Sequence, residues 1–287
     1  MTDRSAPPEP GPDPSVLAVE RDGHTATVFL DRPEKRNAMG MPFFSELPVV
    51  MAKLGSDDQT RAVVIAANGP AFSVGLDLAA LASIGQDESP DSGTDTSQAA
   101  LARRTHAQVV ALQSSISAVA DCPKPVLAAI HGWCIGGGVD LASACDIRLC
   151  SADAVFSVRE TRMAMVADLG SLQRLPDLVA YGYLAELAFT GKDIDADRAE
   201  KMGLVNKVLP DRESALAAAR QMAAEISENS PLAVQGAKAV LAEARRARVE
   251  AGLRFVAAWN AGRLHSDDLR EAVTAFFERR PPTFSGS

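Results

Sequence analysis

The sequence predicts an α/β fold that continues into a helical C-terminal region, and three observations lead to this class. Residues 61–67 and 125–130 form short apolar runs of the length expected for buried strands. Segments with helical spacing of apolar residues lie between such runs, and this alternation favours a parallel sheet with crossover connections. From about Leu172 onward helical spacing dominates. With 287 residues and 47% hydrophobic content, the chain can bury a sizeable core.

The first predicted elements are a hairpin and a helix. Residues 16–20 and 25–30 have strand patterns, and Asp22-Gly23 between them is typical of a tight turn. Residues 41–54 carry apolar side chains at helical spacing, although Pro48 can kink this helix.

Between the two apolar runs, the chain predicts a surface loop and a long helix. Residues 86–97 are acidic, rich in Ser and interrupted by Gly and Pro, as exposed loops are. Residues 99–120 form an amphipathic helical pattern that ends before Cys122-Pro123. The remaining predicted elements are strands at 146–150 and 154–157 and helices at 211–228, 232–248, 249–264 and 267–279.

Charge and composition exclude several classes of partner. The formal net charge is −8 and the pI is about 5.1, so we expect no broad basic face for nucleic acid. No stretch reaches the ~18 apolar residues of a membrane span, so we expect no membrane partner. Residues 1–14 are rich in Pro and acidic residues and lack an apolar core segment, which predicts a disordered tail and not a signal peptide.

The four cysteines indicate a reducing environment. They form no C-x-x-C pair, and three of them lie in apolar surroundings. We therefore expect reduced core residues of a cytoplasmic protein, with neither disulfides nor a metal site. The four are Cys122, Cys134, Cys145 and Cys150.

Three carboxylates lie near one glycine run at residues 136–138. An apolar strand enters this run and a small-residue helix leaves it, so backbone N–H groups are exposed where the helix begins. Asp140 lies two residues after the last glycine of the run. Glu160 and Asp168 come twenty and twenty-eight residues after Asp140. Carboxylates beside such donors suggest proton transfer to and from carbon, with an oxyanion held by backbone N–H groups.

Each carboxylate also has a purely structural interpretation. Asp140 can favour the dipole of the helix that it begins. Glu160 can form a surface ion pair with Arg159 or Arg162. Asp168 can act as the N-cap of the helix that follows it. Only the placement of all three within recognisable motifs favours catalysis.

Other polar residues near these motifs are expected to be structural. Asp77 and Asp146 fit structural roles, and His131, before a glycine turn, fits a hydrogen-bonded core residue. Ser73 has no G-x-S-x-G setting, so a serine nucleophile is not expected. The glycine run lacks both the G-x-x-x-x-G-K pattern and Rossmann spacing, so neither a nucleoside triphosphate nor NAD is indicated.

Four segments resemble the crotonase (enoyl-CoA hydratase/isomerase) superfamily, and they follow one another along the chain in the order that the family has. Residues 71–78, Ala-Phe-Ser-Val-Gly-Leu-Asp-Leu, resemble its first oxyanion-hole signature, and residues 131–146 resemble the second. Residues 32–39 and the pair of segments 190–196 and 203–206 also fit. The likeness covers about residues 16–277.

Within the superfamily, the chain most resembles the Δ3,5-Δ2,4-dienoyl-CoA isomerases. These carry Asp, Glu and Asp at the positions of Asp140, Glu160 and Asp168. Simple hydratases typically have Glu in place of Asp140 and a Gly-rich stretch in place of residues 165–170. The shorter Asp is expected to weaken a site for attacking water.

The resemblance implies a crotonase-like spiral of βαβ turns over residues 15–208 and a C-terminal helical trimerisation region over residues 209–287. It further implies a homotrimer or a dimer of trimers, which would be a homohexamer. It implies no cofactor besides the coenzyme A of the substrate. The thioester would lie between the backbone N–H groups of Leu76 and Gly137. Further substrate-binding candidates are Lys35, Arg36, Ala38, Ser73, Gly75, Asp77 and Gly136.

The implied reaction, in fatty-acid degradation, moves a proton from C2 to C6 of a 3,5-dienoyl-CoA. Our hypothesis places Glu160 at C2 and Asp168 at C6, with the pKa of Asp168 raised by apolar neighbours and Asp140 orienting the other two. The alternatives are an enoyl-CoA hydratase or a Δ3-Δ2-enoyl-CoA isomerase, neither of which needs an acid at C6. A second alternative is a non-catalytic acyl-CoA-binding protein of the same fold.

Overall fold

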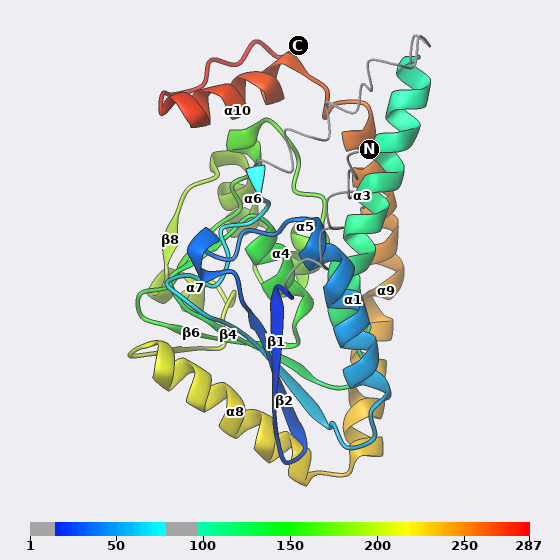
Figure 1. Ribbon diagram of the computed structural model, residues 1–287, viewed down its shortest axis with the longest axis vertical. Helices are drawn as coiled ribbons and strands as arrows, with labels where there is room; N and C mark the ends of the chain where they lie inside the picture. Colours follow the sequence, from blue (N-terminus) through cyan, green and yellow to red (C-terminus); the bar gives the residue numbers. More distant parts are fainter. Residues whose placement is uncertain (1–14, 79–96) are drawn as a thin grey trace, which may run out of the picture.

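The main sheet has six strands in the order β1-β2-β3-β4-β6-β9 (Figure 1). The computed structural model describes residues 15–78 and 97–287. β1 pairs with β2 antiparallel, and every other neighbouring pair is parallel. The strands are β1 (Leu17–Asp22), β2 (Thr25–Leu30), β3 (Ala62–Ala67), β4 (Val126–Ile130), β6 (Ile147–Ser151) and β9 (Lys207–Leu209).

The central strands are apolar throughout because both faces of the sheet are covered. Along β3, Val63 and Ile65 belong to the larger core cluster, while Val64 and Ala66 belong to a second cluster on the opposite face. Successive side chains of a strand point to opposite faces, so a strand buried on both sides has no polar positions to alternate. The apolar run seen in the sequence follows from this two-sided burial.

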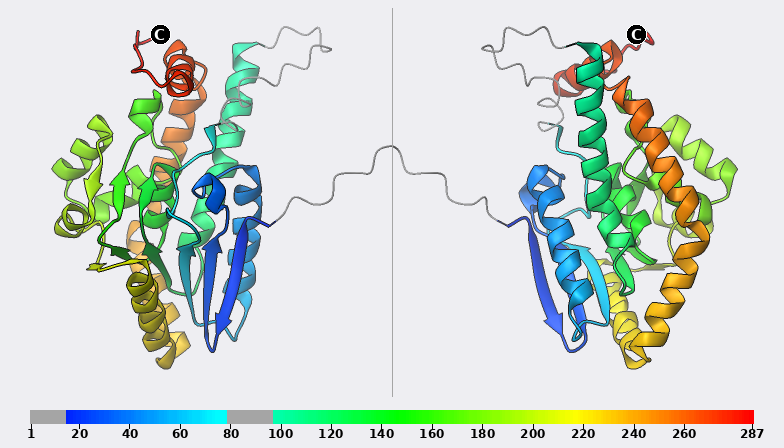
Figure 2. Two further views of the ribbon diagram at one scale, coloured as in Figure 1. Left: turned by 60° about the vertical axis from the view of Figure 1, so that its left-hand side comes forward. Right: turned by 90° about the vertical axis from the view of Figure 1, so that its right-hand side faces the viewer.

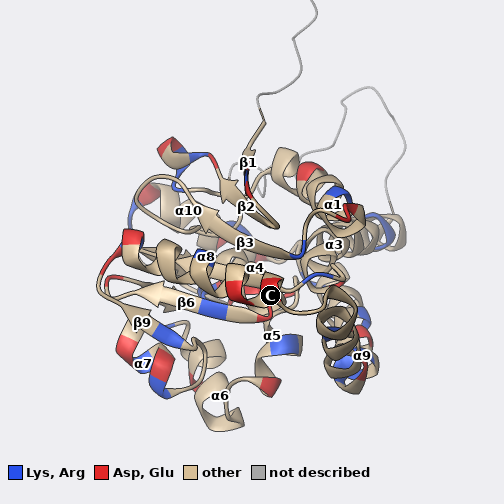
Figure 3. Ribbon diagram, turned by 90° about the horizontal axis from the view of Figure 1, so that it is seen from below, with Lys and Arg blue, Asp and Glu red and all other residues tan. Residues whose placement is uncertain are grey.

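Helices from distant parts of the chain cover the two faces of the main sheet. α1 (Met41–Ser56), α3 (Gln98–Ala120) and α9 (Pro231–Ala261) lie along one side of the molecule, where Figure 2 shows them next to one another. α8 (Arg212–Glu228) lies under the other face and buries Ala219 and Ala223 against the strands. In Figure 3, Lys/Arg and Asp/Glu segments are interleaved along α7 (Ala196–Lys201) and α9.

A smaller sheet carries the glycine turn. It consists of β5 (Trp133–Ile135), β7 (Val155–Ser157) and β8 (Ile194–Asp195), and β5 leads directly into α4 (Gly137–Ala144). The shorter remaining elements are η1 (Pro33–Lys35), η2 (Glu160–Met163), α5 (Ser171–Arg174), η3 (Leu175–Asp177), α6 (Tyr181–Thr190) and α10 (Asp267–Glu278). α10 lies against η2, which follows β7 of this sheet along the chain.

Most predicted elements are present, with one correction in the C-terminal region. The two helices expected at 232–248 and 249–264 are one continuous helix, α9. The prediction of a break was wrong because Gly252 does not interrupt the helix and instead permits close contact. A Cβ atom at Gly252 would lie 2.8 Å from Cγ of Gln173 on the neighbouring α5. Of the loop expected at 86–97, all but Ser97 lies outside the described residues.

Three further expectations concern the core and the helices. The four cysteines are buried and free. His131 is buried and shares a 2.9 Å hydrogen bond with the carbonyl oxygen of Gly69, as a satisfied core residue does. Across residues 15–78 and 97–287, the structure contains no helix with the length and apolar character that crossing a membrane requires.

Candidate active site

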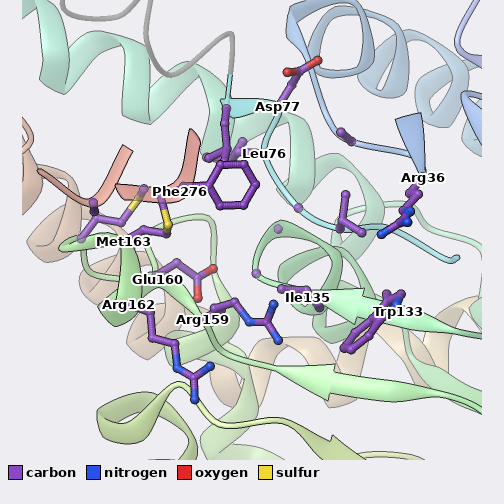
Figure 4. A pocket seen from close by; sticks show the side chains of 18 of the residues that line it. Arg36, Leu76, Asp77, Trp133, Ile135, Arg159, Glu160, Arg162, Met163 and Phe276 are labelled. Atoms are coloured by element: carbon purple, nitrogen blue, oxygen red, sulfur yellow. The ribbon is translucent and has the colours of Figure 1, made fainter. Parts of the chain in front are cut away.

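A pocket of about 700 Å³ lies where the first oxyanion-hole segment, the glycine turn, η2 and α10 meet. Figure 4 shows Glu160 pointing into it, with Phe276 and Met163 beside it. The predicted residues that line it are Lys35, Arg36, Ala38, Gly75, Leu76, Asp77, Gly136, Gly137 and Glu160. Asp140, Asp168 and Ser73 do not line it.

Two backbone N–H groups face the pocket from adjacent turns, those of Leu76 and Gly137. Gly137 is the first residue of α4, and a first-turn N–H has no acceptor within its own helix. Gly75 has a φ of +86°, and a Cβ atom there would lie 2.9 Å from the carbonyl oxygen of Ile135 and 3.2 Å from the nitrogen of Gly137. Only glycine allows the two turns to approach this closely.

Within the described ranges, neither of these N–H groups donates a hydrogen bond to the protein. A carbonyl oxygen placed between them could accept from both. Two unpaired N–H donors on adjacent turns are what an oxyanion hole requires, because such donors stabilise negative charge as it develops on a carbonyl oxygen.

The buried side chain of Ser73 stabilises the backbone of the segment at residues 71–78. It is fully buried, and its hydroxyl donates to the carbonyl oxygen of Asn37 at 2.8 Å and accepts from the N–H of Gly75 at 3.1 Å. Asn37 in turn donates its side-chain amide to the carbonyl oxygens of Asn68 and Ala71. The side chain of Ser73 thus holds the backbone of the oxyanion loop and does not face the pocket.

Glu160 is the carboxylate that enters the pocket. Its Oε2 is buried and finds no hydrogen-bond partner among the described residues. Its Oε1 lies 3.2 Å from the position that a Cβ atom on Gly136 would take, and so beside the oxyanion donors. The pKa of Glu160 is raised to about 8, chiefly by burial and also by the charges of Asp140 and Asp168. The alternative ion pair with Arg159 is not formed, because Arg159 pairs with Asp193.

Asp140 lies behind the glycine turn in the first turn of α4. It is 1% exposed, and its Oδ1 accepts a 2.6 Å hydrogen bond from the backbone N–H of Ser171. Burial raises its pKa to about 6, while the hydrogen bond from the backbone N–H of Ser171 and the Arg174 guanidinium oppose the rise. Asp140 therefore contacts the first residue of α5, and its position is not explained by the helix dipole alone.

Asp168 is held by a residue from the far end of α9. Its Oδ2 accepts a 2.7 Å hydrogen bond from the side-chain amide of Asn260. Burial raises the pKa of Asp168 to about 7; the Asn260 hydrogen bond lowers it, and the charge of Asp140 raises it. The N-cap alternative does not apply, since α5 begins at Ser171 with Gly170 at its N-cap. The pKa of Asp168 is therefore raised by burial, as the apolar residues around it in the sequence predicted.

The opposite end of the pocket carries basic side chains. Lys35 and Arg36 line it, next to the main chain of Ala38. Arg36 ends η1 in a left-handed conformation with a φ of 50°. Asp77 also lines the pocket, and its Oδ2 lies 3.5 Å from a guanidinium nitrogen of Arg32.

Sequence reasoning missed several residues of the site. The pocket wall includes Arg159, Met163 and Met165 from the η2 region and Phe276, Phe277 and Arg280 from the C-terminal segment. The amphipathic pattern of α10 was visible in the sequence, but no local signal places that helix over η2. Asn260 was missed for the same reason, because it lies 92 residues from Asp168 along the chain.

No metal site emerges from the same region. Among residues 15–78 and 97–287, the structure contains no group of three or more His, Cys, Asp or Glu side chains able to hold a metal ion. Asp146, read as structural, accepts from the N–H of Val126 and pairs with Lys238.

The chain belongs to the enoyl-CoA hydratase/isomerase family. The family model described as Enoyl-CoA hydratase/isomerase matches residues 20–287. A crystal structure of enoyl-CoA hydratase/isomerase from Pseudoalteromonas atlantica T6c matches with a TM-score of 0.81 at 26% identity, over 94% of this chain and 100% of that one. An enoyl-CoA hydratase/isomerase from Mycobacterium paratuberculosis gives 0.79 at 28% identity, over 91% and 98%. The predicted crotonase-like fold with C-terminal helices is confirmed.

Three similar proteins share one name, Delta(3,5)-Delta(2,4)-dienoyl-CoA isomerase. The mitochondrial protein of Dictyostelium discoideum is 42% identical over 95% of this chain and 92% of its own length. The peroxisomal protein of Arabidopsis thaliana is 41% identical over 94% and 96%. The mitochondrial protein of Homo sapiens is 43% identical over 93% and 80%. The predicted resemblance to this subfamily is confirmed.

Proposed function

We infer that this protein converts 3,5-dienoyl-CoA thioesters into 2,4-dienoyl-CoA thioesters. One observation carries the proposal: three buried carboxyl groups, those of Asp140, Glu160 and Asp168, have pKa values raised to between about 6 and about 8 beside two unpaired backbone donors. Groups that titrate near neutral pH can both accept and donate protons there. The shared name of the similar proteins supports the same reaction.

The geometry supports a proposed role for a different carboxylate at each end of the dienoyl group. A thioester oxygen between the N–H groups of Leu76 and Gly137 would receive roughly 3–4 kcal/mol of stabilisation per donor as charge develops on it. C2 is bonded to the thioester carbon, and Glu160 lies beside these donors. Glu160 therefore takes the C2 proton, and the electron pair of the broken C–H bond delocalises over the thioester and the two double bonds.

Asp168 completes the reaction at the far end of the conjugated system. It does not line the main pocket, and it lies near enough for its charge to raise the pKa of Glu160. Protonation of C6 by Asp168 leaves double bonds at C2 and C4. Glu160 then holds the proton taken from C2 and Asp168 is left ionised, and transfer of that proton from Glu160 to Asp168 restores the starting state.

The three carboxyl groups titrate as a coupled set, since the charge of Asp140 raises the pKa of both Glu160 and Asp168 and the charge of Asp168 raises the pKa of Glu160. Near neutral pH the set retains some protons and has released others. Asp140 has the lowest of the three pKa values, about 6, and carries the resting negative charge most readily.

We propose that the protein forms a homo-oligomer and acts in a reducing compartment. Exposed apolar side chains along α9 and α10, including Leu232, Phe255 and Phe276, support a homotrimer or a dimer of trimers built on these helices. The substrate would carry its own coenzyme A, with Lys35 and Arg36 near its phosphates, and no other cofactor is proposed. The four free cysteines suit a reducing compartment such as the cytoplasm, although the relatives are named mitochondrial or peroxisomal.

Ultraviolet absorbance of a 3,5-dienoyl-CoA mixed with the protein tests the proposal. Conjugation of the diene with the thioester should raise the near-ultraviolet absorbance, and Glu160→Gln and Asp168→Asn should each abolish most of this rise. A rise that survives in Asp168→Asn would overturn the two-carboxylate mechanism. Hydration of a 2-enoyl-CoA without isomerisation would favour the hydratase alternative, and binding without any turnover would favour an acyl-CoA-binding protein.

A further inference from the structure

Arg174 is a buried cation behind the candidate active site. It is the last residue of α5, it does not line the pocket, and it is 4% exposed. Its guanidinium donates to two neutral acceptors, the carbonyl oxygen of Leu169 at 3.2 Å and the hydroxyl of Ser117 at 2.9 Å. A buried charge is costly unless an opposite charge lies near enough to compensate it.

That opposite charge is supplied by Asp140. α4, which carries Asp140, packs against α5 (Figure 1). Oδ1 of Asp140 accepts from the backbone N–H of Ser171, at the other end of the single turn of α5 that ends with Arg174. Burial lowers the pKa of Arg174, and the charge of Asp140 is the largest opposing effect. Burial raises the pKa of Asp140, and the charge of Arg174 opposes that rise. Each of the two groups therefore favours the charged form of the other.

The guanidinium also supports the backbone that follows Asp168. Gly170 has a φ of 129°, and a Cβ atom there would overlap Nη1 of Arg174 and lie 2.8 Å from its Cζ. The hydrogen bond to the carbonyl oxygen of Leu169 holds the residue directly after Asp168. Ser117 lies on α3, so its hydroxyl fixes the guanidinium from a further helix.

We propose that Arg174 is a positioning residue for the reaction, which keeps Asp140 ionised and holds the segment that carries Asp168. This inference rests on the proposed function, in which Glu160 and Asp168 carry out the proton transfers. Besides burial, the charge of Asp140 raises the pKa of both of these carboxyls. By maintaining that charge, Arg174 sets the pH range in which one carboxyl of the pair is ionised and the other is protonated.

The other charged and titratable groups around Arg174 and Asp140 come from several elements. Besides Glu160 and Asp168 they are Asp121, Cys134, Cys145 and Arg245. Burial raises the pKa of both thiols, that of Cys145 to about 12, so both are neutral near pH 7. The charges of Asp121 and Arg245 act on Arg174 in opposite directions. Near neutral pH, the response to a change at Arg174 should therefore come from the carboxyl groups of the site.

The test is the pH profile of kcat for isomerisation of a 3,5-dienoyl-CoA. Arg174→Met removes the charge, so Asp140 should keep its proton through neutral pH and no longer raise the pKa of Glu160 and Asp168. Both limbs of the profile should then move down by about one pH unit, and at pH 9 kcat should fall about tenfold more than at the optimum. Arg174→Lys keeps the charge and should keep both limbs in place, although loss of the forked hydrogen bonds should lower kcat at every pH.

A matched control and a double variant separate this role from a purely structural one. Arg148 is also buried, at 3% exposed, but it donates to the carbonyl oxygens of Leu204 and Cys145. Arg148→Met should destabilise the protein without moving either limb. Asp140→Asn removes the Asp140 charge by itself, so the addition of Arg174→Met to it should move the limbs no further. Additive shifts would show that Arg174 does not act through Asp140.

A measurement without substrate distinguishes failure of this inference from failure of the proposed function. The infrared band of protonated carboxyl groups, followed from pH 5 to pH 10, reports the buried carboxyls directly. In Arg174→Met the band should persist to higher pH, because Asp140 then keeps its proton, and Asp140→Asn should abolish this difference. If the wild type isomerises no dienoyl-CoA but the infrared difference is present, the proposed function fails and the role of Arg174 stands.

The inference is overturned if Arg174→Met leaves both the infrared titration and the limbs of the profile at their wild-type positions. It is also overturned if Arg148→Met moves them equally. Thermal unfolding establishes that each variant is folded before it is compared. Arg174→Gln, a second neutral variant that retains an amide donor for Leu169, should give the same shifts and replaces Arg174→Met if that variant does not fold.

Discussion

Asn260 donates its side-chain amide nitrogen to two acceptors, Oδ2 of Asp168 at 2.7 Å and the carbonyl oxygen of Val166 at 2.9 Å. Asn260 is 1% exposed, so neither bond competes with water. The pair of bonds fixes both the rotation of the Asp168 carboxyl and the loop that carries it. A helix far along the sequence thereby sets the position of the acid that we propose to serve C6.

Replacement of Asn260 by Leu should slow the reaction more than it weakens substrate binding. A hydrogen bond to a charged group contributes about 1.5–3 kcal/mol, so kcat should fall about 10- to 100-fold with a smaller change in KM. Because the Asn260 bond lowers the pKa of Asp168, its loss should raise that pKa above about 7. Steady-state kinetics across pH measure both effects, and an unmoved pH profile would show that Asn260 has only a structural role.

The pH dependence of kcat should be bell-shaped with both limbs close to neutrality. The rate rises as the pair of Glu160 and Asp168 loses its first proton, because a base is needed at C2, and the lower of the two pKa values is about 7. It falls as the pair loses its second proton, because an acid is needed at C6, and the higher value is about 8. A rate that stays constant between pH 5 and pH 9 would contradict proton transfer by these carboxyls.

Much of this arrangement could be predicted from the sequence because its signals are local. The strand β3 is apolar over a strand's length, and the glycine run with Asp140 lies within a few residues at the start of α4. Such patterns depend on neighbours along the chain. They therefore predicted the fold class, the oxyanion segments and the three carboxylates.

The remaining features depend on contacts between distant segments. Asn260 meets Asp168 across 92 residues, and α10 reaches η2 only after the chain has folded. Gly252 on α9 meets Gln173 on α5 across 79 residues. The residues next to Asn260 or Gly252 in the sequence do not indicate which distant residue each one contacts. The sequence alone could therefore not predict these contacts.

The stability of the protein should fall as pH rises from about 5 to about 8. In the unfolded chain a Glu carboxyl ionises near pH 4, whereas burial in the folded state raises the pKa of Glu160 to about 8. A raised pKa favours the folded state fully below the unfolded value, and this contribution is lost as pH rises toward the folded value. The free energy of unfolding should therefore decrease by on the order of 2–4 kcal/mol over this range.

Glu160→Gln should remove much of this pH dependence, since an amide does not titrate. Urea denaturation at pH 5, 7 and 9 measures the free energy of unfolding, and the variant should exceed the wild type at pH 9. The exposed Glu34→Gln should behave as the wild type does. Parallel decreases in all three proteins would place the titrating group elsewhere.

Gly75→Ala should disable the oxyanion hole without unfolding the protein. The added Cβ atom would lie 2.9 Å from the carbonyl oxygen of Ile135, so the loop that carries the Leu76 N–H must move away from Gly137. Loss of one such donor costs about 100- to 1,000-fold in kcat. Gly182→Ala in α6 is the matched control, because a Cβ atom there meets nothing within 4 Å. Equal activity of the two variants would contradict the role of this turn.

Ala164→Gly should stabilise the protein while leaving the carboxylates in place. Ala164 ends η2 with a φ of 54°, and its N–H donates to the carbonyl oxygen of Thr161. The left-handed conformation costs a residue with a Cβ atom about 1–2 kcal/mol, whereas glycine adopts it freely but loses more entropy on folding. The net expectation is a free energy of unfolding about 0.5–1 kcal/mol higher in urea denaturation. A decrease would mean that the packing of the Ala164 methyl outweighs the strain of its backbone.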